Sequence, residues 1–278
     1  DGELVKFFRA RRDMSLYFLN GAGAGQRRVC YDSLGEAFWI SERLEPAGRR
    51  GMLFWQETME GAVPENMWRI LEGHAVRTEK ILLQKRGDYD RLLEMGADPA
   101  RIGKLGHIYE FRKENGHQPQ ALICTNSERI EHCEELVREF PRMHFHIAAV
   151  TLMSPKLMAL ETYGNVSLYP CVQKPVLDEL FLSCDYYFDI NHWTEIVSAV
   201  YQAFLHNQLI FAFEETIHNR EYVAEAHIYP VAEYAKMAAD VREIMENGET
   251  LDRHLKMQLA EAMAEDRDAY MQVLGGIG

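Results

Sequence analysis

The sequence lacks long hydrophobic runs, paired cysteines and an excess of basic residues. Its longest apolar runs, residues 147–153 and 209–213, are far shorter than the roughly 18 residues of a membrane-spanning helix. Its 30 Lys and Arg residues against 43 Asp and Glu give a net charge of −13, which disfavours a nucleic-acid partner. The five cysteines are scattered without a C-x-x-C pair, a pattern typical of a reducing compartment. These absences predict an acidic, soluble, cytoplasmic protein without a membrane span.

The short motifs of common enzyme classes are absent too. None of G-x-S-x-G, H-E-x-x-H or G-x-x-x-x-G-K-S/T occurs, which disfavours hydrolases and nucleoside triphosphatases. The glycines of residues 21–25 have the spacing G-x-G-x-G with no helix pattern behind them, so they indicate a turn and not a phosphate loop. His144 and His146 alternate along a predicted strand without a third ligand at metal-binding spacing. We therefore predict no metal ion and no cofactor.

What is present is a regular alternation of short apolar runs and amphipathic segments over residues 113–250. Strands are predicted at residues 121–124, 143–149, 166–169, 186–190 and 209–213. Helices are predicted at residues 127–140, 154–163, 174–184, 194–206, 231–247 and 251–272. Strands of this length separated by helices indicate βαβ units and a parallel sheet, so residues 113–250 are predicted to form a Rossmann-like domain.

The residues before this domain are predicted to form a partial α/β domain, residues 1–112. They contain apolar runs at 52–55 and 80–84, a helix pattern that begins with Pro64, and a second helix that Gly96 ends. Residues 111–119 are polar and resemble an interdomain linker, and residues 251–278 are expected to pack back across both domains. The chain begins with Asp1 and not with Met, so we expect it to be a piece of a longer protein.

Candidate site residues follow from the geometry of a parallel sheet, in which ligands bind beyond the carboxyl ends of the strands. Polar side chains follow the first, fourth and fifth predicted strands of this domain. The candidate ligand-binding residues are Thr125, Asn126, Asn191, Thr194, Thr216, His218, Asn219 and Arg220.

Each candidate has a structural alternative beside its functional role. Arg220 is suited to bind a phosphate or carboxylate in a bidentate manner, and His192 to act as an acid or base near neutral pH. Asn191 and Thr194 are also good caps for the helix predicted to start at residue 194, so capping alone accounts for them equally well. A solvent-facing loop accounts for Glu214 and Glu215.

Several strings resemble one known family. The strings CTNSERIEHCEEL, FHIAAVTLMSPKL, DINHWTEI and LIFAFEETIHNREY are similar to the stabilising subunits of the peptide O-GlcNAc transferase of the accessory Sec system, which glycosylates serine-rich adhesins in Gram-positive bacteria. This resemblance implies a GT-B-like α/β fold with a partial acceptor-side N-terminal domain. It also implies a subunit that binds a Ser/Thr-rich acceptor polypeptide and stabilises a catalytic glycosyltransferase subunit. A peripheral position at the inner face of the membrane stays open.

The sequence departs from active GT-B enzymes at the donor site. Such enzymes carry two glutamates eight positions apart, and the corresponding positions here are Thr194 and Gln202. They also carry Arg and Lys after the first strand, where Arg129 is the local cation in this sequence. The alternative hypothesis is an active GT-B glycosyltransferase that uses a nucleotide sugar such as UDP-GlcNAc. In that case His192 and Glu195 are the candidate catalytic residues, and helix N-termini near residues 127 and 194 hold the phosphates.

Overall fold

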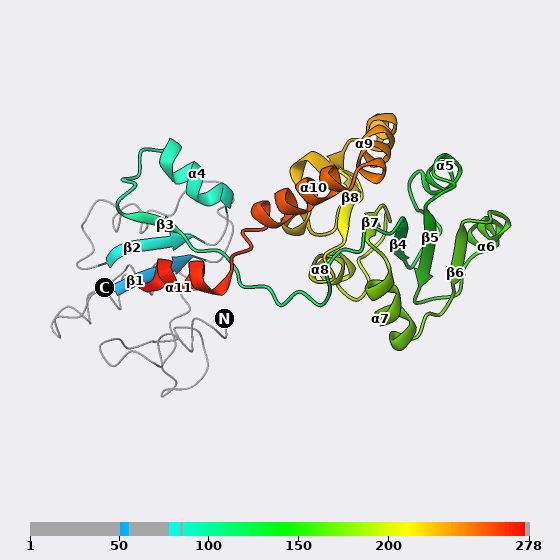
Figure 1. The fold of residues 1–278 in the computed structure, drawn as a ribbon, viewed down its shortest axis with the longest axis horizontal. Coiled ribbons are helices and arrows are strands. Elements are labelled where there is room, and N and C mark those ends of the chain that lie inside the picture. Colours follow the sequence, from blue (N-terminus) through cyan, green and yellow to red (C-terminus); the bar gives the residue numbers. More distant parts are fainter. Residues whose placement is uncertain (1–50, 56–77, 84–85, 276–278) are drawn as a thin grey trace. The chain divides into compact units, whose positions relative to one another are not determined.

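The structure is a computed structural model that describes residues 51–55, 78–83 and 86–275. The chain divides into two compact units, the first of residues 1–108 with 263–278 and the second of residues 109–262. Figure 1 shows the course of the chain through both units. The predicted glycine turn at residues 21–25 and the predicted helix that begins with Pro64 lie outside the described residues.

The first unit contains a three-stranded parallel sheet in the order β1-β2-β3. Its elements are β1 (Gly51–Trp55), β2 (Thr78–Leu83), α4 (Arg86–Glu94), β3 (Ile102–Lys104) and α11 (Arg267–Gly275). The C-terminal segment joins this unit through His107, whose backbone N–H donates to the Met263 carbonyl at 2.8 Å while its carbonyl accepts from Glu265 N at 2.9 Å. Strands at 52–55 and 80–83 and a helix ending before Gly96 agree with the sequence prediction.

The second unit is a six-stranded parallel sheet in the order β6-β5-β4-β7-β8-β9. Its strands are β4 (Gln120–Thr125), β5 (His144–Ala149), β6 (Val166–Tyr169), β7 (Tyr186–Asp189), β8 (Leu209–Phe213) and β9 (Ile228–Tyr229). All five strand pairs are parallel, so the Rossmann-like prediction is confirmed. The short edge strand β9 was not predicted, because two residues carry no periodicity.

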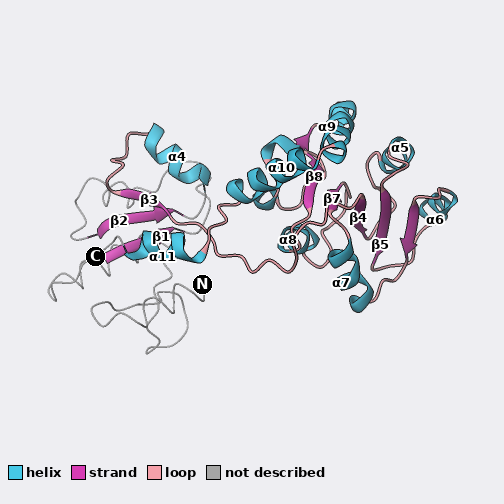
Figure 2. Cartoon of the chain, in the orientation of Figure 1, coloured by secondary structure: helices cyan, strands magenta, loops and turns pink. Residues whose placement is uncertain are grey.

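Helices cover both faces of this sheet (Figure 2). They are α5 (Cys133–Glu139), α6 (Pro155–Met158), η2 (Ala159–Thr162), α7 (Lys174–Ser183), α8 (Ala199–Leu205), η3 (Arg220–Tyr222), η4 (Glu225–His227), η5 (Val231–Glu233), α9 (Tyr234–Glu246) and α10 (Gly248–Glu261). Alternate strand residues supply the two cores. Tyr186 and Phe188 pack on the side of α5 and α9, whereas Tyr187 packs on the side of α7 and α8.

Two predicted helix starts are wrong. The helix expected from residue 127 begins at Cys133, and the helix expected from residue 194 begins at Ala199. Residues 129–131 instead bond to residues 190–192, with Glu131 N donating to the Ile190 carbonyl at 2.8 Å. Before α8, Val197 and Ser198 take positive φ values of 50° and 52°, which a continuous α-helix excludes. The predicted helix N-termini near residues 127 and 194 are therefore not present at those positions.

The side chain of Gln258 on α10 completes the hydrogen bonding of β8. It is 1% exposed, accepts from Ile210 N at 3.0 Å and donates to the Gln208 carbonyl at 2.9 Å. Strand β9 pairs with β8 only at Ala212 and Phe213, so it does not satisfy these backbone groups. Gln258 thus acts as a substitute for a neighbouring strand.

Replacing Gln258 with Leu is expected to lower the free energy of unfolding by about 3 kcal/mol, because two buried backbone groups lose their partners at about 1–3 kcal/mol each. Urea denaturation measures the change. Gln173→Leu is the matched control, since Gln173 is exposed and makes one bond to the Cys171 carbonyl. An equal loss of stability in both variants would contradict this role.

No helix of the described ranges is long and apolar enough to cross a membrane. Of the four described cysteines, Cys124, Cys133 and Cys184 are buried and Cys171 is exposed.

Candidate functional site

The loops after β4 and β7 lie on either side of the switch point, where the order in which the chain adds strands to the sheet reverses. From β4 the chain adds β5 and β6 on one side, and then β7, β8 and β9 on the other. In doubly wound sheets the loops at such a switch point diverge and leave the crevice where ligands bind. The candidate residues at 125–126 and 191–195 follow these two strands.

Here the two loops are tied together by their own side chains. The Thr125 hydroxyl is buried and lies 3.1 Å from Asn191 Oδ1, and Asn126 Nδ2 donates to Thr194 Oγ1 at 3.1 Å. Asn191 Oδ1 also accepts from Trp193 N at 3.3 Å. The structure therefore brings four predicted residues together, and it gives Asn191 and Thr194 a role other than the helix capping considered above.

One polar atom in this cluster is left without a partner. Asn126 Oδ1 is buried and accepts no hydrogen bond from any described residue. A buried carbonyl oxygen without a donor costs free energy, and buried polar atoms of native proteins are normally paired. A bound molecule with a hydroxyl or amide N–H would satisfy this atom.

A second cluster centres on Asp189, the last residue of β7. Its carboxylate is 2% exposed and accepts from His218 Nδ1 at 2.6 Å and from His218 N at 2.7 Å. This hydrogen bond raises the pKa of His218 to about 9, so the imidazole is charged at neutral pH. His218 Nε2 donates to the Trp193 carbonyl, and Thr216 Oγ1 donates to the Asp189 carbonyl at 2.7 Å.

Asp189 was not among the predicted site residues. It joins the β7 loop to the β8 loop through His218, and both ring nitrogens of His218 are used in doing so. The available signal was an acidic residue that ends an otherwise apolar strand, YYFD.

The two candidate catalytic residues are bound to other parts of the chain. His192 Nε2 bonds to the carboxylate of Glu131, and Glu195 Oε1 accepts from Val200 N at 2.8 Å. Glu195 thus stabilises the first turn of α8, in the place of the missing N-cap side chain. Neither carboxylate is left without a hydrogen-bond partner.

The remaining candidates, Asn219 and Arg220, lie at the start of η3. Asn219 Oδ1 accepts from Glu221 N at 3.3 Å and so caps this short helix. The Arg220 guanidinium forms two hydrogen bonds with the carboxylate of Glu225, one of them from Nε at 3.1 Å. This pairing holds the Arg220 guanidinium at Glu225 on the surface, whereas Arg129 on the β4 loop is exposed.

Comparison with known proteins places this arrangement in a family. Residues 121–258 match the model of the GftB/GlyA-F C-terminal domain, and residues 11–95 match that of the GtfB third domain. The chain belongs to the GtfB family. The relatives include the GtfB proteins of Streptococcus agalactiae (38% identity over 275 residues, 98% of this chain and 61% of the relative) and Streptococcus gordonii (33% over 276 residues, 99% and 61%). Both are named UDP-N-acetylglucosamine–peptide N-acetylglucosaminyltransferase stabilizing protein.

A solved structure extends the likeness to three dimensions. The crystal structure of the GtfA/B complex bound to UDP and GlcNAc matches with a TM-score of 0.81 and 34% identity, over 88% of this chain and 55% of that chain. The predicted GT-B-like fold and the predicted family are thereby confirmed. This GtfB-family chain spans about three fifths of the length of the curated relatives it matches, at 61% of each.

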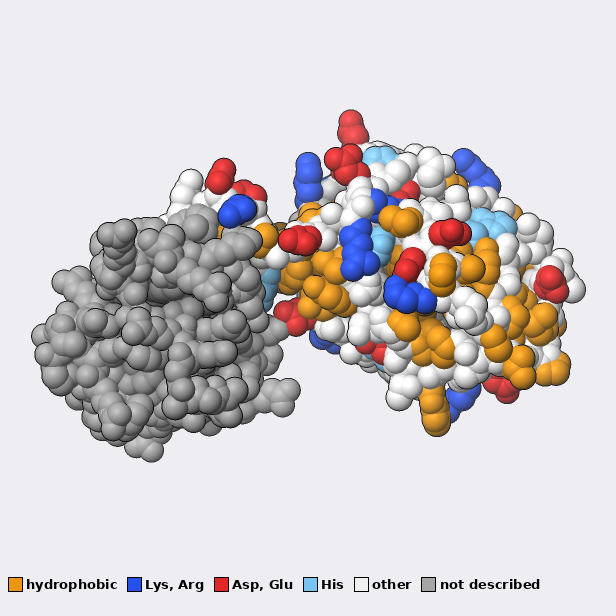
Figure 3. All heavy atoms as spheres, turned by 90° about the horizontal axis from the view of Figure 1, so that it is seen from below, with side chains coloured by type: hydrophobic (Ala, Val, Ile, Leu, Met, Phe, Trp, Pro, Cys, Tyr) orange, Lys and Arg blue, Asp and Glu red, His pale blue; other side chains and the backbone are white. Residues whose placement is uncertain are grey.

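Exposed hydrophobic side chains lie on the loops beside the switch point of this GtfB-family chain. Leu152 follows β5 and is 83% exposed, whereas Trp193 and Val197 follow β7 and are 59% and 52% exposed. Figure 3 shows hydrophobic side chains gathered on one face of the second unit. Contiguous exposed apolar patches rimmed by polar residues are typical of interaction sites, whereas single exposed apolar residues are common on any protein surface.

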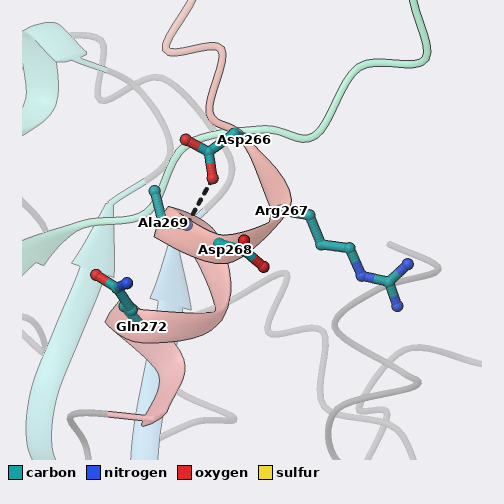
Figure 4. Close-up of a pocket in the computed structure, with 5 residues that line it drawn as sticks. All are labelled: Asp266, Arg267, Asp268, Ala269 and Gln272. Carbon is teal, nitrogen blue, oxygen red and sulfur yellow. Dashed lines mark hydrogen bonds between the residues drawn. The ribbon is translucent and has the colours of Figure 1, made fainter.

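The first unit has a hollow at the start of α11, shown in Figure 4. Its lining residues are Asp266, Arg267, Asp268, Ala269 and Gln272. Asp266 Oδ1 accepts from Ala269 N at 2.8 Å, which is ordinary N-terminal capping. Since all the lining residues come from the first two turns of α11 and the residue before it, no groups from different elements converge there to mark a functional site.

Proposed function

We propose that this GtfB-family chain binds a Ser/Thr-rich acceptor polypeptide and stabilises a catalytic GlcNAc transferase, without transferring sugar itself. The names of its relatives, stabilizing proteins of a peptide N-acetylglucosaminyltransferase, support this proposal. So does the related GtfA/B complex, whose structure contains UDP and GlcNAc. The cytoplasm is the expected location of such a subunit.

The observation that carries the proposal is the identity and the hydrogen bonding of the two residues at the donor-site positions. In place of the two glutamates of active GT-B enzymes, Thr194 accepts from Asn126 and Gln202 accepts from Arg112 NH1 at 3.2 Å. The nearby carboxylate of Glu195 is used by the backbone of α8. A nucleotide sugar would therefore lack the two carboxylates for its hydroxyls, and binding to the cation at position 220 would have to displace Glu225.

The same edge of the sheet offers groups that suit a polypeptide. Asn126 Oδ1 is a buried acceptor without a donor, and a peptide N–H or a serine hydroxyl supplies one. Trp193 and Leu152 add exposed apolar area for the aliphatic parts of the bound chain. We assign the ligand-binding role of the predicted residues at this edge to acceptor polypeptide on these grounds.

The first test measures donor binding. Isothermal titration of the chain with UDP-GlcNAc is expected to give no binding in the micromolar range. Micromolar affinity would contradict the proposal and favour the active transferase instead.

A copurification experiment tests the proposed partner. When the native full-length protein is purified from its cells at low salt, a glycosyltransferase is expected to copurify and to be identified by mass spectrometry. If no glycosyltransferase copurifies, the proposed association with a catalytic subunit is contradicted.

The second test measures acceptor binding in the full-length protein. Trp193→Ala is expected to weaken the binding of a labelled Ser/Thr-rich peptide at least tenfold, about 1.4 kcal/mol or more, because exposed tryptophans dominate many interfaces. Leu182→Ala is the control, since Leu182 is 50% exposed on α7 and away from the β4 and β7 loops. Fluorescence anisotropy measures the peptide affinities of both variants. Equal affinities would show that Trp193 does not contribute to peptide binding.

A further inference from the structure

The second unit contains a cavity at the edge of the sheet opposite the candidate site. It has a volume of about 280 Å³. Its walls come from the segments that enter β4, β5 and β7 and from the last turns of α5 and α9. The lining residues are His117, Pro119, Glu139, Phe140, Pro141, Arg142, Tyr186, Arg242, Met245 and Glu246. Because strands begin at this edge, the cavity is separate from the loops at the carboxyl ends.

The most informative lining residue is Tyr186, the first residue of β7. It is 2% exposed, and its hydroxyl forms no hydrogen bond with any described residue. Burial and the neighbouring Asp185 carboxylate raise the pKa of Tyr186, so the hydroxyl keeps its proton at all physiological pH values. A phenol hydroxyl that lines a cavity and is not bonded to a described residue is available to donate a hydrogen bond to a bound molecule.

The charges of the cavity lining cancel. Glu139 accepts hydrogen bonds from Arg242 NH2 and from Tyr234, and the Arg242 guanidinium lies 5.6 Å from the centre of the Phe140 ring. Arg142 and Glu246 add one charge of each sign at the exposed rim. A charged ligand entering the cavity would lose hydration without a net opposite charge to replace it, which favours a neutral ligand.

The apolar part of the lining indicates the shape of the ligand. Phe140 and Tyr186 supply aromatic walls, and Met245 supplies a flexible, polarisable one. An apolar cavity of about 150 Å³ accommodates benzene. The larger volume here, about 280 Å³, accommodates a six-membered ring with a substituent.

We propose that this cavity is a binding site for a neutral, ring-containing small molecule whose carbonyl or ether oxygen accepts a hydrogen bond from Tyr186. The site is separate from the acceptor and donor positions of the proposed function. Its occupancy is read out directly by binding and does not depend on glycosyl transfer.

The test uses two probes of similar shape with the whole chain, acetophenone and isopropylbenzene, titrated by protein NMR. Acetophenone is expected to bind with the tighter Kd and to shift signals of residues 139–142 and 242–246. Tyr186→Phe, which removes only the unpartnered oxygen, is expected to weaken acetophenone binding about threefold to tenfold and to leave isopropylbenzene binding unchanged. Met245→Trp fills the cavity and is expected to abolish the binding of both probes.

Tyr187→Phe is the matched control, because Tyr187 packs in the core on the other face of β7. It is expected to leave the acetophenone affinity unchanged. Equal acetophenone affinities in the wild type and in Tyr186→Phe would overturn the proposal. Binding that persists in Met245→Trp, or no acetophenone binding up to its solubility limit, would overturn it as well.

Discussion

Replacing Asp189 with Asn is expected to lower the free energy of unfolding by about 3 kcal/mol near pH 6. The Asp189 carboxylate is 2% exposed and holds the His218 ring, which is 14% exposed. Its hydrogen bond raises the pKa of His218 from 6.5 to about 9. At about 1.4 kcal/mol per pKa unit, this rise corresponds to roughly 3 kcal/mol of stabilisation of the charged imidazole in the folded protein.

The same replacement is expected to change the pH dependence of stability. A group whose pKa is higher in the folded state stabilises the fold fully below its unfolded pKa, and this contribution is lost as the pH rises through the folded pKa. For His218 the contribution is complete below about pH 6.5 and lost by about pH 9. The wild type should therefore lose stability across this range relative to Asp189→Asn, whose His218 has lost its partner.

Denaturation curves at a series of pH values between 5.5 and about 9.5 measure both effects. Asp252→Asn is the control, because Asp252 pairs with His117 at 2.8 Å and both side chains are about half exposed. Such surface pairs contribute about 0–1 kcal/mol. Parallel stability profiles for the wild type and Asp189→Asn would show that the Asp189–His218 contact contributes nothing through protonation.

The strands could be predicted from the sequence because their signal is local. Residues 166–169 and 209–213 form strands at the predicted bounds, since each is a short apolar run between polar segments. The starts of α5 and α8 could not be predicted in the same way. Ser127 and Thr194 have the side chains of helix caps, but their oxygens bond to Arg129 N and Asn126 Nδ2 instead.

The location of the candidate site could be predicted from the sequence, but the hydrogen bonds between its side chains could not. Parallel strands end at one edge, and so the turns at 125 and 191 had to meet. The pairing of Asp189 with His218, 29 residues further along the chain, depends on the register of β7 against β8 and leaves no local pattern. Likewise, the sequence alone does not show that Arg220 forms an ion pair. The structure shows that its guanidinium donates to the carboxylate of Glu225.

A second large effect is expected at Asp185, which holds residues 113–118 to the second unit. These residues were predicted to belong to an interdomain linker, yet they form hydrogen bonds and an ion pair with residues of the second unit. Lys113 Nζ lies 2.5 Å from Asp185 Oδ1, and Gln118 N donates to Asp185 Oδ2 at 2.7 Å. Lys113 Nζ also donates to the Cys184 carbonyl at 2.6 Å. The Asp185 side chain is 2% exposed and that of Lys113 is 14% exposed, so the ion pair is largely dehydrated.

Asp185→Asn is expected to lower the free energy of unfolding by about 3–5 kcal/mol, because it leaves the Lys113 ammonium buried without its counter-charge. It should also speed hydrogen exchange at Gln118 N, since that amide loses a charged acceptor. Asp178→Asn is the matched control. Asp178 pairs with Lys174 at 2.7 Å on the exposed face of α7, and its loss should cost less than about 1 kcal/mol.

A double variant separates the ion pair from the burial of Asp185 alone. If the unpaired ammonium causes the loss in Asp185→Asn, then adding Lys113→Met removes the buried charge and restores part of the stability. The double variant is therefore expected to be more stable than Asp185→Asn. A double variant no more stable than the single one would assign the loss to the hydrogen bond from Gln118 N, and residues 113–118 would then be held by backbone contacts and not by charge.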